Sequence, residues 1–245
     1  MNTPFELERF SAVVVGDGTI ACSLIEQLLA MPNLGHLQVL RRSARALPED
    51  VRLSIAPLDI TDPSTLEAAA GELPDGNLHL LINTVGLLHS ATVMPEKRLS
   101  KVTAQQLHTY FSTNAILLPL LAQAYGRALR HKEAAQLISF SARVGSIDDN
   151  RMGGWYGYRA SKAAHNMLLK TLAQEWRVSH KNVTVAALHP GTVRSQLSEP
   201  FVTERYPNRV LEGSECATAT LQVMASLTPS QSGCFLDWKG ETIPW

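Results

Sequence analysis

The chain has 245 residues with 22 basic and 22 acidic side chains, so its formal net charge is zero. This charge balance gives no reason to expect nucleic acid as a partner, and the length is enough to bury a sizeable core. With 45% hydrophobic and 18% charged residues the composition is that of an ordinary globular protein, and no apolar run approaches the roughly 20 residues that span a bilayer.

The three cysteines bear on the cellular compartment. Cys22, Cys216 and Cys234 are odd in number, lie far apart and never form a Cys-x-x-Cys pair. This pattern predicts free thiols in a reducing compartment, hence a cytoplasmic location, and it argues against a zinc site. Because the histidines show no ligand spacing either, we expect no metal centre. The lack of a long apolar run leads us to expect no membrane association.

Short apolar runs alternate with segments of helical periodicity along the whole chain. Strands are predicted at residues 10–15, 37–40, 53–58, 78–83, 135–140, 182–188 and 233–236. Helices are predicted at residues 19–30, 103–130, 155–179 and 214–226, with a short alanine-rich helix after residue 63. Since the strands are continuously apolar, the pattern indicates a parallel sheet covered on both faces. We therefore expect an α/β fold: one Rossmann-type, doubly wound domain over residues 1–245, with about seven strands and helices on both faces.

The turn between the first strand and the first helix fits Gly-x-Gly-x-x-Ala. It consists of Gly16, Asp17, Gly18, Thr19 and Ile20, followed by an alanine. Glycines at such a turn let the backbone approach a pyrophosphate, and the helix N-terminus favours negative charge. The motif predicts a dinucleotide site, and a plain strand-to-helix turn without a ligand is the alternative.

Arg41 and Arg42 stand where the second strand is predicted to end. In dinucleotide-binding folds an acidic residue at this point holds the ribose hydroxyls, whereas Arg accommodates a 2′-phosphate. Two arginines and no acid favour NADP(H) over NAD(H). A solvated basic turn is the alternative reading.

The strongest chemical signal is Tyr158 followed four residues later by Lys162. On a helix, side chains at this spacing share one face, about 5–6 Å apart at Cβ. A nearby ammonium favours the phenolate, so the pair can exchange a proton at neutral pH. Asn114 lies inside the predicted helix 103–130, where Asn is unfavourable and usually faces solvent, so by itself this position indicates no function.

With these motifs in order, the chain resembles the short-chain dehydrogenase/reductase family over essentially its whole length. Tyr158 and Lys162 match the family's Tyr-x-x-x-Lys, and Asn114 matches its structural and proton-relay Asn. The resemblance implies that Tyr158 exchanges a proton with the substrate. It also implies that Lys162 lowers the Tyr pKa and holds the nicotinamide ribose, and that Asn114 anchors a relay through water.

Three further segments resemble the family's cofactor motifs. They are an adenine-contacting segment at residues 58–60, an Asn-Asn-Ala-Gly-like run at residues 83–86, and a Pro-Gly-x-Val-x-Thr-like run at residues 190–195. Together with the glycine turn and the two arginines, the resemblance assigns cofactor binding to Asp59, Ile60, Asn83, Thr84, Val85, Gly86, Tyr158, Lys162, Pro190, Gly191, Val193 and Ser195. Residues 143–147, 153–158 and 240–245 are similar to the C-factor (cell–cell signalling) branch of the family.

One departure concerns catalysis. The family's catalytic Ser is the second residue of Ser-Ser-x-x-Gly, and that position is Ala142 in this chain. Losing such a hydrogen-bond donor typically costs about 10²–10³ in rate. Ser141 and Ser146 are the nearby hydroxyls that could replace it, and we take Ser141 as the candidate. The glycine motif also lacks the family's last two glycines, which weakens the expected cofactor site.

We therefore expect an NADP(H)-dependent short-chain oxidoreductase that reduces a carbonyl or oxidises an alcohol on a small molecule. The alternative is a weakly active or inactive dinucleotide-binding protein with a signalling or interaction role. Members of the family often assemble through their two long helices, and the sequence leaves a homo-oligomer open.

Overall fold

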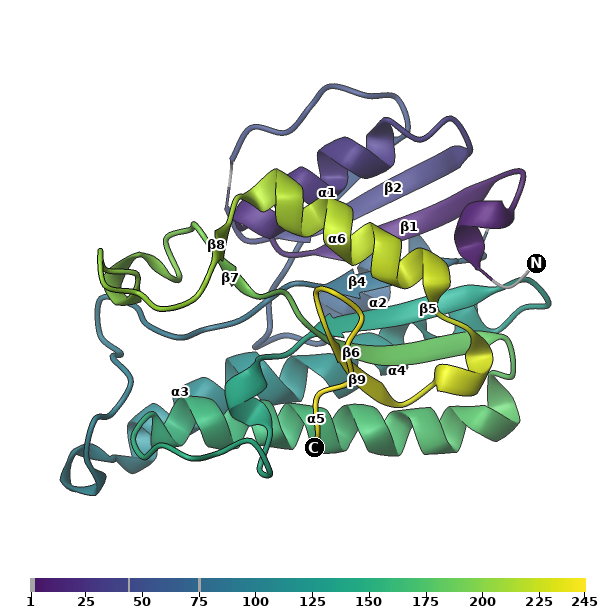
Figure 1. Ribbon diagram of the computed structural model, residues 1–245. Coiled ribbons are helices and arrows are strands. Elements are labelled where there is room, and N and C mark those ends of the chain that lie inside the picture. The colour runs from purple at the N-terminus through teal and green to yellow at the C-terminus, as the bar shows by residue number, and fades with distance from the viewer. Residues whose placement is uncertain (1–2, 44, 75) are drawn as a thin grey trace.

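The computed structural model describes residues 3–43, 45–74 and 76–245. Its main sheet has seven parallel strands in the order β3-β2-β1-β4-β5-β6-β9, with helices on both faces (Figure 1). The strands are β1 (Phe10–Val15), β2 (Leu34–Arg41), β3 (Leu53–Pro57), β4 (Leu80–Asn83), β5 (Ala135–Phe140), β6 (Val183–His189) and β9 (Cys234–Asp237). The predicted Rossmann-type α/β architecture is confirmed.

The helices follow the predicted order with one interruption. They are α1 (Thr19–Leu29), α2 (Ser64–Gly71), α3 (Ala104–Phe111), α4 (Leu117–Leu129), α5 (Tyr156–Ser179) and α6 (Gly213–Ser226). The predicted helix 103–130 is divided by a π-helical segment, Ser112–Ile116, which contains Asn114. Short π-helical segments of this kind occur frequently at functional sites.

Smaller elements lie in the connections between the main strands and helices. The parallel pair β7 (Thr192–Val193) and β8 (Val210–Leu211) was not predicted. The 3₁₀ turns are η1 (Pro4–Glu6), η2 (Leu99–Lys101), η4 (Arg143–Gly145), η5 (Glu199–Phe201) and η6 (Pro229–Gln231).

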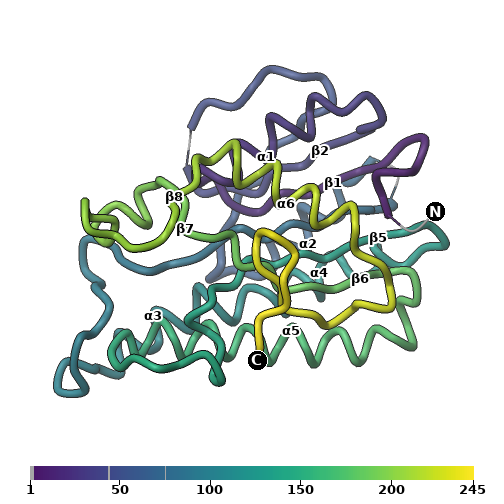
Figure 2. Tube along the Cα trace, viewed as in Figure 1, coloured from purple at the N-terminus to yellow at the C-terminus, as the bar shows by residue number. Residues whose placement is uncertain are grey.

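Each face of the sheet has its own hydrophobic core, because side chains alternate along every strand. Val13 and Val15 of β1 pack with α2, α4 and α5, whereas Ala12 and Val14 pack with α1 and α6. The tube view shows α1 and α6 side by side on one face and α5 across the sheet from them (Figure 2). All six residues of β1 are buried, which explains its continuously apolar sequence.

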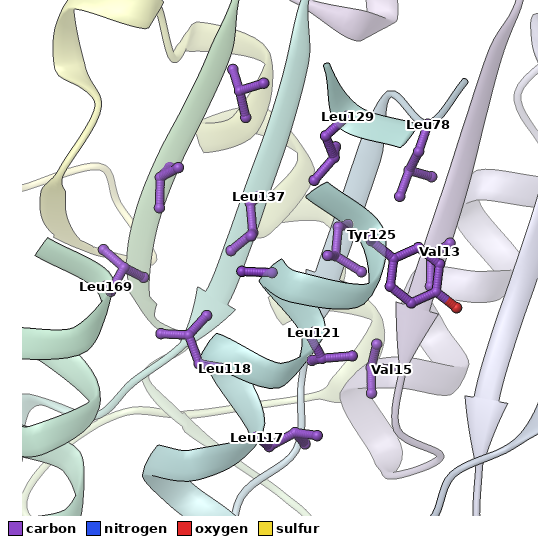
Figure 3. Close-up of a cluster of buried hydrophobic side chains, with 14 of the residues drawn as sticks. Val13, Val15, Leu78, Leu117, Leu118, Leu121, Tyr125, Leu129, Leu137 and Leu169 are labelled. Atoms are coloured by element: carbon purple, nitrogen blue, oxygen red, sulfur yellow. The ribbon is translucent and has the colours of Figure 1, made fainter. Parts of the chain in front are cut away.

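Helix α4 fills much of the core that it shares with α2 and α5. Its inward face places Leu117, Leu118, Leu121 and Leu129 against the strands, as Figure 3 shows. Tyr125 lies in the same row, and its hydroxyl donates to Gln38 Oε1 of β2 at 2.7 Å. This bond satisfies the two polar groups inside an otherwise apolar layer, where an unpaired group would cost about 1–3 kcal/mol.

The strand order reverses between β1 and β4, and in such sheets ligands bind at the carboxyl ends of the strands next to this point. The chain is closely packed there. Gly16 directly follows β1 with φ 118°, and a Cβ on it would lie 2.4 Å from Thr84 Oγ1, just after β4. A residue without a side chain is therefore required at position 16.

Two further observations concern membrane-spanning helices and the state of the cysteines. Within the described ranges, no helix combines the length and the apolar character needed to cross a bilayer. Cys22, Cys216 and Cys234 are all free thiols, as predicted.

We predict that Gly16→Ala lowers the free energy of unfolding by about 2–5 kcal/mol, because it adds backbone strain to a steric clash. Gly18→Ala is the matched control: a Cβ on Gly18 meets nothing within 4 Å, so a change of about 1 kcal/mol or less is expected. Urea denaturation measures both variants, and equal effects would contradict the steric argument.

Candidate active site

The predicted acid–base pair lies on the buried face of α5. Tyr158 is 7% exposed and Lys162 is 3% exposed. Lys162 Nζ donates a hydrogen bond to the carbonyl of Phe140, the last residue of β5, at 2.9 Å. Burial lowers the pKa of Lys162 to about 8, because a buried ammonium loses its hydration.

The pKa of Tyr158 is not lowered in this structure, and the expected contribution of Lys162 to it stays a prediction. Burial raises the pKa of Tyr158 well above its ordinary value of 10.0, and the neighbouring Tyr110 acts in the same direction. The cost of burying a phenolate therefore exceeds any help from the nearby ammonium. At neutral pH Tyr158 is an uncharged phenol, which can donate a proton.

Glu96 stabilises the start of α5 through a contact that no motif in the sequence predicted. Its carbonyl accepts from Trp155 N at 2.5 Å, and its Oε2 accepts from Gly157 N at 3.1 Å. A carboxylate at a helix N-terminus is stabilised by the helix dipole. Among the described non-glycine residues, Trp155 alone has a positive φ, 54°, so Glu96 secures a strained turn just before Tyr158.

Asn114 connects three segments around the pair. Its Oδ1 accepts from Leu87 N at 2.7 Å, and its Nδ2 donates to Leu87 O at 2.9 Å and to Ser161 Oγ at 3.0 Å. The side chain is 3% exposed, so it does not face solvent as a mid-helix Asn usually does. The arrangement fits the structural part of the role that the resemblance implies.

The two candidate hydroxyls differ in how they are engaged, because Ser141 donates its proton whereas Ser146 accepts a hydrogen bond. Ser141 Oγ donates to Asn166 Oδ1 of α5 at 2.5 Å, and Ser146 Oγ accepts from Asp149 N at 3.0 Å. Ala142, by contrast, packs in the same cluster as Tyr158. The geometry argues against Ser141 as the substrate donor, because its proton is committed to Asn166.

An apolar cover surrounds Tyr158. Its ring lies 6.1 Å from those of Tyr110 and Trp155, and Trp155 lies 5.1 Å from Phe201 of η5. Leu88 and Val93 pack in the same cluster. Leu88, Val93 and Phe201 come from loops 87–101 and 196–210, in which the sequence showed no chemistry, whereas Tyr110 belongs to α3 and Trp155 directly precedes α5.

The glycine turn offers backbone groups to a ligand. Helix α1 starts at Thr19, and Gly18 at its N-cap provides no side-chain hydrogen bond. Since a Cβ on Gly18 would meet no atom, open space lies beside the first amides of this helix. Ile20 packs partly buried behind them. Free amides at a helix N-terminus fit a pyrophosphate.

Asp17 and Arg42 carry opposite charges at the predicted ribose site, and the charge of Arg42 acts on Asp17. Asp17 Oδ2 accepts from Ser43 N at 2.9 Å. Partial burial raises the pKa of Asp17, but hydrogen bonds from Ser43 and the charge of Arg42 outweigh it and leave the pKa below its usual value. Arg42 is exposed, whereas the Arg41 guanidinium donates to the Arg45 carbonyl. The charge of Arg42 would attract a 2′-phosphate at this site, whereas the Asp17 carboxylate would repel it.

The end of β4 carries the next predicted cofactor residues. Asn83 Nδ2 donates to Ser139 Oγ at 2.9 Å, and Val85 N donates back to Asn83 Oδ1 at 3.1 Å. Thr84 Oγ1 donates to the carbonyl of Val15. A Cβ on Gly86 would come within 3.5 Å of Lys162 Nζ, so the absent side chain leaves room beside the ammonium.

The remaining predicted residues lie at strand ends along the same edge. Asp59 follows β3, and its Oδ1 accepts from Thr61 N and Thr61 Oγ1, while Ile60 packs on the core. Pro190 and Gly191 follow β6, and Gly191 has φ 77°. Val193 is buried in β7, and Ser195 Oγ donates to its carbonyl. Their cofactor contacts stay predictions.

At the opposite edge of the sheet, the structure brings together three residues for which no role was predicted. His79, His131 and Glu133 offer ligand atoms within 4.8 Å of one another. His79 Nδ1 accepts from Ser11 N at 3.0 Å, so its proton is on Nε2, which lies 3.0 Å from Glu133 Oε2. A metal at this point would have to displace that proton, so the contact is better described as a hydrogen bond from a neutral His79 to the Glu133 carboxylate.

We predict that Ser141→Ala lowers the free energy of unfolding by about 1–3 kcal/mol, because Asn166 Oδ1 loses the hydroxyl that donates to it inside the protein. The control is Ser112→Ala, an exposed hydroxyl that bonds within its own helix, for which about 0.5 kcal/mol or less is expected. Chemical denaturation measures both, and a neutral Ser141→Ala would contradict the assignment.

Comparisons with known proteins identify the family of this chain. The family model for short chain dehydrogenases matches residues 24–205. The C-signal of Myxococcus xanthus is 28% identical over 74% of this chain and 100% of its own. The 1-hydroxy-2-glutathionyl-2-methyl-3-butene dehydrogenase of Rhodococcus sp. (strain AD45) is 30% identical over 77% of this chain and 78% of its own. An NADPH-bound carbonyl reductase from chicken fatty liver superposes with a TM-score of 0.84 at 26% identity, covering 100% and 99% of the two chains. The chain therefore belongs to the short-chain dehydrogenase family of oxidoreductases.

Proposed function

We propose that this protein is an NADP(H)-dependent oxidoreductase that reduces a carbonyl group or oxidises the corresponding alcohol. The observation that carries the proposal is the buried pair of Tyr158 and Lys162 on one face of α5, next to the carboxyl ends of β4 and β5. The apolar side chains packed around Tyr158 favour an apolar substrate.

The roles follow from the environment of each group. Tyr158, held as a neutral phenol, would donate its proton to the carbonyl oxygen of the substrate. Lys162 would stabilise the phenolate that results, and its low pKa lets it return a proton near neutral pH. Asn114 would keep the loop at Leu87 and helix α5 in register around the pair.

The residues present fit a nicotinamide dinucleotide. The amides at the start of α1 would bind its pyrophosphate, and the gap beside Gly86 would admit the ribose next to Lys162. When bound, the dinucleotide supplies the hydride. Arg42 supports NADP(H), and the NADPH in the chicken carbonyl reductase agrees with that preference. The carboxylate of Asp17 opposes it.

A second candidate is a dinucleotide-binding signalling protein with little or no turnover. It is favoured by Ala142, by the hydrogen bond that Ser141 donates to Asn166, and by the similarity to C-signal. Binding of NADPH without turnover of any carbonyl or alcohol would support this candidate over the enzyme. A cytoplasmic location remains a prediction from the free cysteines.

We predict that Tyr158→Phe lowers the rate of NADPH-dependent reduction of an aldehyde, ketone or quinone by about 10²–10⁴, because the proton donor is removed. Tyr156→Phe, a change at a 39% exposed ring two residues away, is the control and should keep the wild-type rate. Steady-state kinetics measures both, and unchanged turnover in Tyr158→Phe would disprove the mechanism.

We predict that Ala142→Ser raises turnover about tenfold or more, because it restores a hydroxyl beside Tyr158. The measurement is kcat with the best carbonyl substrate of the panel. No gain would mean that another donor already serves the substrate.

We predict that NADPH binds more tightly than NADH, and that Arg42→Ala weakens NADPH about tenfold without affecting NADH, as expected for loss of a charge-assisted bond to a phosphate. Asp17→Asn should strengthen NADPH, because it removes a negative charge from the same corner. Nicotinamide fluorescence titrations give the dissociation constants, and tighter NADH binding by the wild type would refute the preference.

A further inference from the structure

The loop after β4 carries a histidine that contacts the segment between β7 and β8, residues 194–209. His89 Nε2 lies 2.9 Å from the main-chain carbonyl oxygen of Gln196. The imidazole lies 5.7 Å from the ring of Phe201, at an interplanar angle of 65°. One side chain therefore makes both a polar and an aromatic contact with this segment, and the acid–base mechanism uses neither.

The contact with Gln196 has a fixed direction. A carbonyl oxygen can only accept a hydrogen bond, so His89 Nε2 carries a proton and donates it. This N–H is present in the charged imidazolium as well as in the neutral ring with its proton on Nε2. The bond therefore does not require a particular charge on His89.

The loop that carries His89 is anchored to the interior. The carbonyl of the preceding residue, Leu88, accepts a hydrogen bond from the Tyr110 hydroxyl at 2.7 Å. The amide and the carbonyl of Leu87 are both bound by the Asn114 side chain. Tyr110 and Asn114 are themselves buried, so His89 is mounted on a fixed support.

The segment 194–209 is attached more weakly. Its ends are joined by β7 and β8, a pair of two-residue strands separate from the main sheet. Thr192 Oγ1 and the Tyr206 hydroxyl, 2.6 Å apart, add one bond near these ends. Residues 203–205 and 207–209 are exposed. A segment with so little buried surface opens at a lower free-energy cost than the strands of the sheet.

Phe201 is the part of this segment that reaches the candidate site. It packs in the cluster that contains Tyr158, and its ring lies 5.1 Å from that of Trp155, which lies 6.1 Å from Tyr158. The Phe201 ring therefore contacts the anchored loop through His89 and the wall beside the phenol through Trp155. Movement of the segment would carry Phe201 with it and widen the space beside Tyr158.

We propose that His89 is a positioning residue that limits the size of the substrate. It holds the segment 194–209 against the loop after β4, so that Phe201 closes the apolar space beside Tyr158. A small apolar carbonyl compound is enclosed there, whereas a bulky one has to displace Phe201 and break the bond between His89 and Gln196. The proposal rests on the proposed function and adds a size limit to it.

The strength of this contact suits control of an opening better than stabilisation of the whole fold. His89 and Phe201 are partly exposed, and Gln196 is exposed. Loss of one such hydrogen bond changes an equilibrium about fivefold, which is small against the stability of a domain. The same factor is large for the ratio between the open and closed forms of a single segment.

The test compares His89→Phe, which keeps a ring but loses the donor, with His89→Gln, whose amide nitrogen takes nearly the place of imidazole Nε2. The measurement is kcat/KM with NADPH for butanal and for 2-naphthaldehyde, a small and a bulky apolar aldehyde. We expect His89→Phe to lower the ratio of the butanal value to the 2-naphthaldehyde value about fivefold, because the small substrate is no longer enclosed. His89→Gln should keep this ratio within about twofold of the wild type.

The control for the kinetics is His108→Phe, at an exposed histidine of α3, which should leave the ratio unchanged. A wild-type ratio in a folded His89→Phe would overturn the proposal, and so would an equal loss in His89→Phe and His89→Gln. A contact that served stability alone would not change the preference between the two aldehydes.

A second measurement follows the opening itself and does not need turnover. Arg205 is an exposed trypsin site inside the segment, and cleavage there tracks the population of the open form when opening is fast relative to cleavage. We expect cleavage after Arg205 about fivefold faster in His89→Phe than in the wild type, and nearly unchanged in His89→Gln. Cleavage after Lys132, an exposed residue before β5, is the internal control. Equal rates at Arg205 in the wild type and His89→Phe would contradict the proposal.

The outcomes separate this proposal from the proposed function. If the wild type binds NADPH but reduces neither these aldehydes nor any other carbonyl compound, the enzymatic function and the size limit fail together. The trypsin rates then still decide whether His89 holds the segment closed. If the wild type reduces both aldehydes but His89→Phe changes neither their ratio nor the trypsin rate, the enzymatic function stands and the role of His89 is overturned.

Discussion

The hydrogen bonds of the Asn114 side chain hold the candidate site together. One amide joins the loop after β4, the π-helical segment and helix α5, through Leu87 and Ser161. Because the amide is buried, each of these bonds would leave an unsatisfied polar group if it broke, at about 1–3 kcal/mol. Gly86, Tyr158 and Lys162 therefore keep their relative positions without any covalent or ionic link between the three segments.

Desolvation sets the resting state of the acid–base pair. Burial disfavours charge, so it raises the pKa of Tyr158 and lowers that of Lys162 and His165. These shifts keep Tyr158 and His165 uncharged at neutral pH and bring Lys162 close to losing its charge. Charge that develops during a reaction would have to be stabilised by specific contacts rather than by water, which makes the missing hydroxyl at Ala142 more important than it would be in a solvated site.

The cover of the site depends on a local strain. Trp155 adopts a left-handed conformation just before α5 and packs between Tyr158 and Phe201. Such a conformation costs of order 1–3 kcal/mol and persists only where its surroundings compensate. Glu96 provides that compensation with a backbone and a side-chain bond to the same turn. The apolar wall beside Tyr158 and the start of its helix are therefore secured by one acidic residue.

The sequence by itself determined the order of strands and helices, the parallel sheet and the edge at which the special residues gather. These follow from local patterns: continuous apolar runs, helical periodicity and glycine turns. Tyr158 and Lys162 were identifiable for the same reason, since their spacing is a property of a single helix.

Only the tertiary structure decided what surrounds them. Glu96, His165, the π-helical break at Asn114 and the commitment of Ser141 to Asn166 all depend on contacts between segments distant in the sequence. The pKa of Tyr158 is raised rather than lowered, because burial disfavours the charged phenolate. A neighbouring lysine can be read from spacing, but burial is the sum of every residue packed around the ring, and no local pattern contains it.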